Sequence, residues 1–152
     1  MSKPVAATTT PFAVLSQTAF FEGLTPERLD RVAALSKLQE CTEGELVYRI
    51  GDSAATVYVL VSGMVRLAIG MGSRQASAGD VLRRGDVFGW AALTPTSRVR
   101  IATASCLSPC TFLAIDGAGL LTLMEADHTL GFRLATQLNR LVTGTLTTFA
   151  AG

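Results

Sequence analysis

The spacing of hydrophobic and polar positions changes twice along the chain, which divides it into a central β region with helices on either side. The first helix is predicted to begin after Thr25, which is placed to cap it, with Pro26 suited to the first helical position. Leu29, Val32 and Ala33 follow at helical spacing and predict its buried face. At least one helix therefore precedes the β region.

From about residue 38 to residue 115, the apolar residues form short runs that end at glycine turns. The three clearest runs are 46–50, 57–61 and 64–69. Shorter runs lie around 81–82, 100–106 and 111–115. Together these runs predict about seven or eight strands, and the polar stretch 70–75 between two of them is predicted as an exposed hairpin tip. So many short strands are typical of a small barrel or jelly roll.

After residue 115 the helical spacing returns. Asp116 is placed to cap a short helix, and Asp127 is placed to cap a longer one. The longer helix carries a row of leucines at spacings of three and four: Leu130, Leu134, Leu138 and Leu141. This row has two interpretations: it packs on the barrel, or it pairs with a second copy of the chain. The second interpretation predicts a homodimer through the C-terminal helix.

The predicted fold class is therefore mainly β with flanking helices. We expect an eight-stranded jelly-roll-like β-barrel with an N-terminal helix or helices and two C-terminal helices. The chain has 152 residues, of which 49% are hydrophobic and 16% charged, which suits one domain with a substantial core. Residues 1–10 are rich in Thr, Ala and Pro and are expected to form a flexible lead, and residues 11–152 a single domain.

The charge balance and the cysteines narrow the class of protein. With 13 basic and 12 acidic residues, the chain has no general attraction for nucleic acid or for an anionic membrane, and no direct DNA binding is expected. Its three cysteines include no CxxC pair and suggest a reducing compartment. We find no signal-peptide pattern and no apolar run long enough to span a membrane. A cytoplasmic location is expected.

Catalytic and metal sites find no support in the sequence. His128 is the only histidine and is expected at the surface where the last helix begins, so a multi-histidine metal site cannot form. Cys106 and Cys110 flank a predicted turn and are expected to be packed, reduced thiols. Serines and threonines lack a partnered base for nucleophilic catalysis. We expect no enzyme activity and no bound metal.

The segment 85–104 carries the strongest functional signal. Its residues 88–93 are predicted as a strand end that runs into one short helical turn, and Arg100 is predicted to open the next strand, 100–104. The start of a helical turn leaves backbone N–H groups free, and a guanidinium nearby adds positive charge. Together they predict a pocket for a small anion, most naturally one phosphate.

The order of elements and turns resembles the cyclic-nucleotide-binding domain of catabolite-activator regulators and of cyclic-AMP-dependent kinase regulatory subunits. The likeness covers about residues 19–149. It rests on an ordered set of turns: Gly44-Glu45, Gly51-Asp52, Gly63, Gly85-Asp86 and Phe88-Gly89. In the DNA-binding regulators the last helix leads into a helix-turn-helix, whereas here only about three residues follow Phe149, so no DNA-binding domain is expected.

The resemblance implies a ligand and a site. The ligand would be a cyclic nucleotide, with cyclic AMP favoured over cyclic GMP, and the C-terminal helices would pass the signal to a protein partner that is not identified. The residues expected to line the phosphate site are Gly89, Trp90, Ala91, Ala92, Arg100 and Ile101. Trp90 and Phe88 are the expected contacts to the base or ribose.

Two positions depart from the family pattern. Trp90 stands where the family has a glutamate that accepts a hydrogen bond from the ribose, and Ile101 stands where a small residue is usual, which predicts a tighter floor beside the phosphate. Loss of one hydrogen-bond partner costs about 1–3 kcal/mol, or roughly ten- to a hundredfold in affinity. Trp90 therefore weakens binding, stacks on the ligand or closes the pocket.

The alternative function is a degenerate roll that acts as a protein-interaction or docking module without binding nucleotide.

Overall fold

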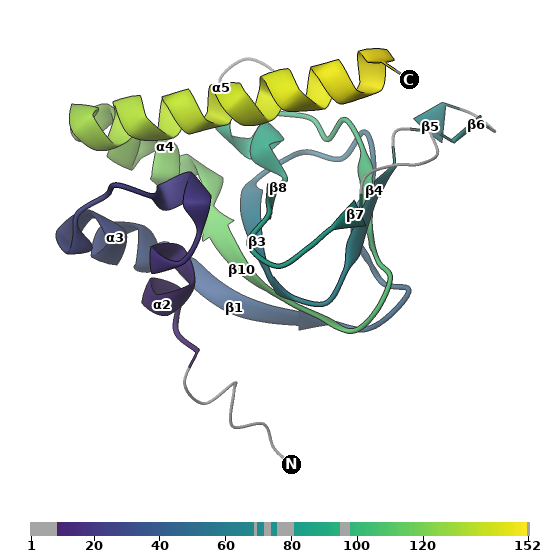
Figure 1. Cartoon of the computed structure of the whole chain (residues 1–152), viewed down its shortest axis with the longest axis horizontal. Helices are drawn as coiled ribbons and strands as arrows, with labels where there is room; N and C mark the ends of the chain where they lie inside the picture. The colour runs from purple at the N-terminus through teal and green to yellow at the C-terminus, as the bar shows by residue number, and fades with distance from the viewer. Residues whose placement is uncertain (1–8, 69, 72–73, 76–80, 95–97, 152) are drawn as a thin grey trace.

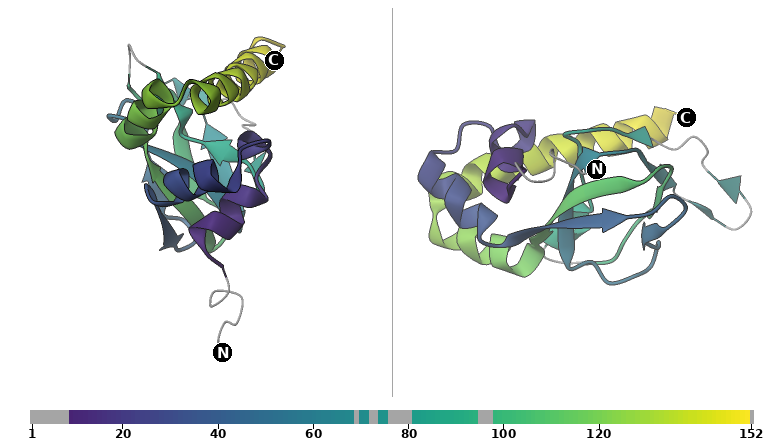
Figure 2. Two further views of the ribbon diagram at one scale, coloured as in Figure 1. Left: turned by 90° about the vertical axis from the view of Figure 1, so that its left-hand side faces the viewer. Right: turned by 90° about the horizontal axis from the view of Figure 1, so that it is seen from below.

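The computed structural model describes residues 9–68, 70–71, 74–75, 81–94 and 98–151. Its strands form a roll, and the helices gather on one side and at one end of it (Figures 1 and 2). The helical elements are α2 (Pro11–Ser16), the short 3-10 helix η1 (Ala19–Phe21), α3 (Pro26–Ala33), α4 (Gly117–Ala126) and α5 (His128–Ala151). The long helix α5 begins beside the other helices and runs across the roll, so the C-terminal end of the chain lies on the side of the roll away from α2 and α3 (Figure 1).

The helix starts that the sequence predicts are confirmed by their capping bonds. The Thr25 hydroxyl accepts a hydrogen bond from the Arg28 N–H at 3.3 Å, at the start of α3. The Asp116 carboxylate accepts from Gly119 at 3.0 Å, and that of Asp127 accepts from Leu130 at 3.3 Å. Each cap satisfies a backbone donor that has no partner within its helix.

The strands form two four-stranded antiparallel sheets and one small hairpin. The first sheet has the order β1-β10-β3-β8 and the second the order β2-β9-β4-β7. The strands are β1 (Ser36–Cys41), β2 (Leu46–Tyr48), β3 (Thr56–Ser62), β4 (Val65–Ala68), β5 (Gly70–Met71), β6 (Arg74–Gln75), β7 (Val81–Leu82), β8 (Val87–Phe88), β9 (Thr103–Cys106) and β10 (Cys110–Asp116). The eight-stranded jelly roll with N-terminal helices and two C-terminal helices is confirmed.

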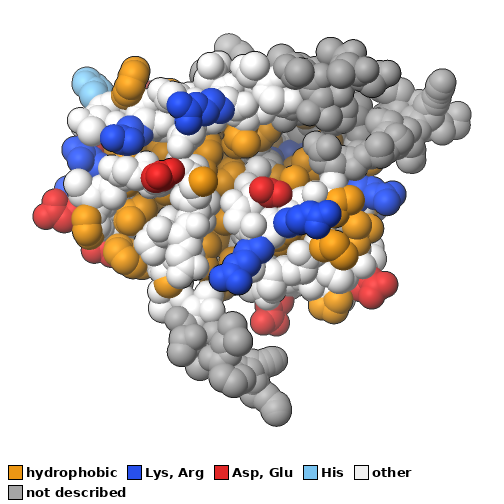
Figure 3. All heavy atoms as spheres, viewed as in Figure 1, with side chains coloured by type: hydrophobic (Ala, Val, Ile, Leu, Met, Phe, Trp, Pro, Cys, Tyr) orange, Lys and Arg blue, Asp and Glu red, His pale blue; other side chains and the backbone are white. Residues whose placement is uncertain are grey.

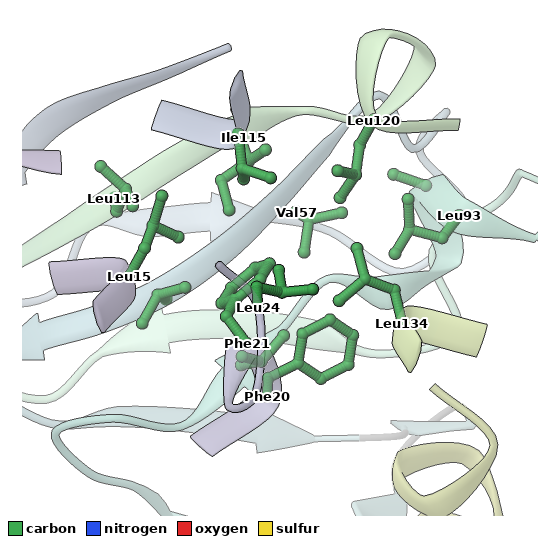
Figure 4. Close-up of a cluster of buried hydrophobic side chains, with 14 of the residues drawn as sticks. Leu15, Phe20, Phe21, Leu24, Val57, Leu93, Leu113, Ile115, Leu120 and Leu134 are labelled. Carbon is green, nitrogen blue, oxygen red and sulfur yellow. The ribbon is translucent and has the colours of Figure 1, made fainter. Parts of the chain in front are cut away.

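The two central strands of the first sheet, β3 and β10, are buried on both faces. Along β3, Val57 and Val59 point toward the helices, whereas Tyr58 and Leu60 point into the roll, because side chains alternate along a strand. Burial on both faces explains why β3 and β10 read as nearly continuous apolar runs. Figure 4 shows the cluster between sheet and helices, with Val57 and Ile115 facing Leu120, Leu134 and the N-terminal aromatic pair of Phe20 and Phe21.

The leucine row of α5 faces the protein's own core. Leu130 and Leu134 are fully buried, and Leu138 and Leu141 pack against the same cluster. The first of the two interpretations of this row therefore holds. Among residues 128–144 of α5, whose side chains the structure describes, Phe132 is a large apolar residue that stays uncovered, with 75% of its surface exposed.

An ion pair joins α3 to the junction between α4 and α5. The Arg28 side chain donates to both carboxylate oxygens of Asp127, with Nε–Oδ2 at 2.7 Å and Nη2–Oδ1 at 3.3 Å. Arg31 adds a longer contact at 3.5 Å. The hydrogen bond from Arg28 holds the pKa of Asp127 below its ordinary value. A two-pronged guanidinium–carboxylate contact has a defined orientation, so it fixes how α3 meets the start of α5.

Candidate functional site

The segment that the sequence singled out forms the predicted strand end and helical turn. β8 ends at Phe88, Gly89 adopts a left-handed backbone with φ 76°, and the 3-10 helix η2 spans Trp90–Leu93. A Cβ on residue 89 would lie 2.9 Å from Arg100 Nη1 and 3.0 Å from Tyr58 Cδ2. Both the backbone angle and the crowding therefore require glycine here.

Arg100 lies beside this glycine and is almost completely buried, with 4% of its surface exposed. It does not open a strand, as the sequence predicted, because β9 begins three residues later at Thr103. Instead its backbone N–H donates to Asp52 O at 2.8 Å and its carbonyl accepts from Gly51 at 2.9 Å. The turn at Gly51-Asp52 therefore holds the backbone of Arg100 outside the regular ladder.

The guanidinium is bonded to backbone carbonyls. Nη1 donates to Gly89 O at 2.8 Å, and Nη2 donates to Thr56 O at 2.8 Å. Nε is buried and has no hydrogen-bond partner within the part of the chain that the structure describes. Arg100 thus meets Gly89, as the resemblance implied, but through the carbonyl oxygen, and it keeps at least one buried N–H available to an acceptor.

Two tyrosines that the sequence analysis did not single out complete the surroundings of Arg100. The Arg100 Cζ atom lies 4.1 Å from the ring centroid of Tyr48 and 5.9 Å from that of Tyr58. Tyr48 and Tyr58 stack at 6.1 Å, and Tyr58 and Phe88 stack at 5.2 Å. The signal that could have found them is their place on buried faces of predicted strands, because aromatic faces attract a guanidinium.

Burial is the main cause of the pKa shifts of Arg100 and of the two tyrosines beside it. Burial lowers the pKa of Arg100, although the two tyrosines oppose this, and the guanidinium remains a cation at neutral pH. Burial raises the pKa of Tyr48 to about 12, and it also raises the pKa of Tyr58. Both phenols therefore stay neutral at pH 7, and the Asp52 carboxylate also raises the pKa of Arg100. A buried cation whose direct contacts are neutral rings and backbone carbonyls favours an anionic ligand.

The remaining predicted site residues divide between core and surface. Ala91, Ala92 and Phe88 are buried, and Phe88 lies within the aromatic stack inside the roll. Trp90 is half-buried. Ile101 is 45% exposed, so its side chain lies at the surface rather than in the core beside Arg100. The expected tight floor beside Arg100 is therefore not formed by Ile101.

The single histidine and the two cysteines beside the predicted turn lie where the sequence predicts. His128 is exposed at the start of α5, and it is the pale blue group on the surface in Figure 3. Cys106 and Cys110 are buried free thiols, and burial raises the pKa of Cys106 to about 12. Over the described residues, no group of three His, Cys, Asp or Glu side chains is arranged to hold a metal ion.

A surface groove lies along the outer side of α5. Its volume is about 530 Å³. It is lined by Glu22, His128, Thr129, Phe132, Arg133, Thr136, Gln137 and Arg140. Gln137 Nε2 donates to Ala19 O at 3.1 Å, which attaches α5 to η1 beside the groove. Basic and acidic side chains are interspersed on the face seen in Figure 3.

No helix among the described residues is both long and apolar enough to cross a membrane.

The chain is 25% identical over 134 residues to a protein of Rhodopseudomonas palustris named as a candidate potassium channel, covering 88% of this chain and 31% of that protein. The chain thus spans under a third of the length of this curated relative.

Solved structures share the fold. A protein from Geobacter metallireducens named as a candidate cyclic nucleotide-binding protein superposes with a TM-score of 0.77 at 23% identity, over 91% of this chain and 98% of that one. The regulatory domain of Toxoplasma gondii PKA with cAMP gives 0.66 at 21% identity, over 78% of this chain and 45% of that one. The sequence profile described as "Cyclic nucleotide-binding domain" matches residues 38–127, which include the roll, the turn at Gly89 and Arg100. The chain therefore belongs to the cyclic nucleotide-binding domain family, whose members are non-catalytic sensor domains.

Proposed function

We propose that this domain binds a cyclic nucleotide, with cyclic AMP preferred over cyclic GMP, and that Arg100 and the amides around Gly89 hold the cyclic phosphate. The observation that carries the proposal is the buried guanidinium whose Nε lacks a partner in the described residues. An unpaired buried donor costs about 1–3 kcal/mol, and such groups are rare outside functional sites. A phosphate oxygen would supply the missing acceptor.

The packing of η2 offers a route from this site to the C-terminal helices. Gly117, the first residue of α4, donates its N–H to Ala55 O at 2.9 Å. A Cβ on Gly117 would lie 2.8 Å from the Cβ of Ala92, so the start of α4 is in close contact with η2. A ligand that shifts η2 would therefore displace α4 and, through it, α5. This contact supports the role of a sensor that signals through its C-terminal helices to a protein partner.

The proposal is tested by calorimetry of the purified domain with cyclic AMP and cyclic GMP. We expect one site per chain and tighter binding of cyclic AMP. Because Trp90 has no acceptor for the ribose hydroxyl, Trp90→Glu is expected to tighten binding by roughly ten- to a hundredfold. If neither nucleotide binds wild type or Trp90→Glu at millimolar concentration, the nucleotide proposal is wrong and the docking alternative takes its place.

We propose a second copy of the chain as the partner of the outer face of α5. Phe132 is 75% exposed on the side of α5 opposite the buried Leu130 and Leu134, and in a two-fold dimer it would pack against its own equivalent. An exposed aromatic side chain gains most from such a contact.

Light scattering coupled to gel filtration tests the dimer. Wild type is expected to be dimeric, and Phe132→Glu monomeric, because two carboxylates cannot be buried against one another. Thr122→Glu changes an exposed residue on α4, serves as the control and should stay dimeric. A monomeric wild type at high micromolar concentration would rule out this interface.

A further inference from the structure

The ring of Tyr48 covers the guanidinium of Arg100. Tyr48 is the last residue of β2, and its backbone pairs with Ala104 on β9. Arg100 Cζ lies over the face of this ring, 4.1 Å from its centroid, which is a cation–π contact distance. The ring of Tyr58, at 5.9 Å, lies further away. Of the two tyrosines, Tyr48 is therefore the one in direct contact with the cation.

Tyr48 also lies close to the turn at Gly89. Its ring centroid is 6.3 Å from that of Phe88, the residue before Gly89. The Gly89 backbone lowers the pKa of Tyr48, opposing the larger effect of burial. Tyr48 therefore contacts the cation of the proposed site and lies beside the turn whose amides the proposed function assigns to the phosphate.

Arg100 is closed off from solvent by the groups around it. Only 4% of Arg100 is exposed, although its backbone lies outside the ladder between Val99 and Ile101, which are each 45% exposed. The Gly89 and Thr56 carbonyls hold the two terminal nitrogens, and the guanidinium carbon lies over the Tyr48 ring. An anion that bonds to the remaining Nε–H must pass the groups that bury it, and among these Tyr48 is the side chain in direct contact with the guanidinium.

We propose that Tyr48 is an internal cover of the anion site, which lies against the guanidinium of Arg100 beside the turn at Gly89 and must withdraw before an anion binds. The identity of the anion as a cyclic nucleotide rests on the proposed function. The cover itself rests only on the contact between Tyr48 and Arg100 and on the burial of Arg100. Tyr48 would then set the affinity of the site, because a site that is open for a fraction of the time binds with that fraction of its intrinsic affinity.

Arginine-selective labelling with phenylglyoxal measures the cover without any ligand. The labelling rates of Arg100 and of exposed Arg98 are compared by peptide mass mapping, with Arg98 as the internal reference. Wild type is expected to label slowly at Arg100. Tyr48→Leu, which removes the ring, should speed Arg100 labelling about tenfold or more relative to Arg98. Tyr48→Phe keeps the ring and should give a rate between the two.

Tyr58→Phe is the matched control. It also removes one tyrosine hydroxyl near Arg100, but the ring of Tyr48 stays in contact with the guanidinium. It should label like wild type. Circular dichroism confirms that each variant is folded, and Tyr48→Phe keeps the test valid if Tyr48→Leu does not fold. If Arg100 is labelled at the same rate in wild type and in every folded Tyr48 variant, the proposal that Tyr48 covers Arg100 is wrong.

Titration with cyclic AMP separates this inference from the proposed function. Uncovering the site should tighten binding, by about threefold in Tyr48→Phe and about tenfold in Tyr48→Leu. If labelling accelerates but no nucleotide binds to any variant, the cover stands and the nucleotide proposal fails. If nucleotide binds with the same affinity to wild type and to both Tyr48 variants, the cover is wrong and the nucleotide proposal stands.

Discussion

Replacing Arg100 with alanine is expected to weaken the binding of cyclic AMP by at least about a hundredfold. Hydrogen bonds from a guanidinium to a phosphate contribute about 1.5–3 kcal/mol each, and Arg100 is the buried cation beside Gly89. The same change leaves the carbonyls of Gly89 and Thr56 without their donors, so the melting temperature should also fall. Calorimetry and thermal melts on the same samples measure both effects.

Arg98→Ala is the matched control for this experiment. Arg98 precedes Arg100 by two residues but is exposed to solvent, so its removal costs little stability and should change affinity by no more than a few-fold. Arg100→Lys keeps the charge without the planar fork and should fall between wild type and alanine. Equal affinities for Arg100→Ala and Arg98→Ala, in folded proteins, would show that the phosphate is bound elsewhere.

The largest loss of stability from a single added methyl group is expected at Gly63. This glycine precedes β4 with φ 95°, and a Cβ there would overlap the Pro109 carbonyl oxygen and lie 2.7 Å from Cys110 Sγ and 2.9 Å from Cys110 Cα. The left-handed backbone costs about 1–2 kcal/mol for alanine, and overpacking against backbone atoms adds about 1–3 kcal/mol. Gly63→Ala should therefore lower the free energy of unfolding by about 2–5 kcal/mol in urea titrations.

Gly51→Ala isolates the contribution of the backbone angle. Gly51 has a nearly equal φ of 93°, but nothing lies within 4 Å of a Cβ built there. It should cost only about 1–2 kcal/mol. A loss at Gly63 no greater than that at Gly51 would mean that the β9–β10 turn yields to the added methyl group without strain.

The sequence predicts the fold well because its strongest signals are local. Capping residues such as Thr25 and Asp116 act within one turn of the chain, so their effect does not depend on the rest of the fold. The glycines that carried the resemblance all have positive φ: Gly44, Gly51, Gly63, Gly85 and Gly89. The order of these glycines along the chain therefore matches the order of sharp turns in the roll. Membership of the family also confirms that the domain is not an enzyme.

The details of the site depend on contacts between distant segments, and these were not predictable. Spacing along the chain places Arg100 near Gly89, but only the fold brings Thr56 O and the Tyr48 ring against the same guanidinium. Likewise, helical spacing shows that α5 has an apolar row but not which surface covers it. The apolar cluster between the first sheet and the helices covers Leu130 and Leu134, whereas Phe132 remains exposed.

The ion pair between Arg28 and Asp127 links parts of the chain that are 99 residues apart in sequence. Asp127 also caps α5, so one carboxylate fixes both the start of that helix and its distance from α3. Any rotation of α5 about its first turn must therefore carry α3 with it or break the pair. The N-terminal helices would then report the state of the domain as directly as the C-terminal helix does, and an output partner could read either end of the chain.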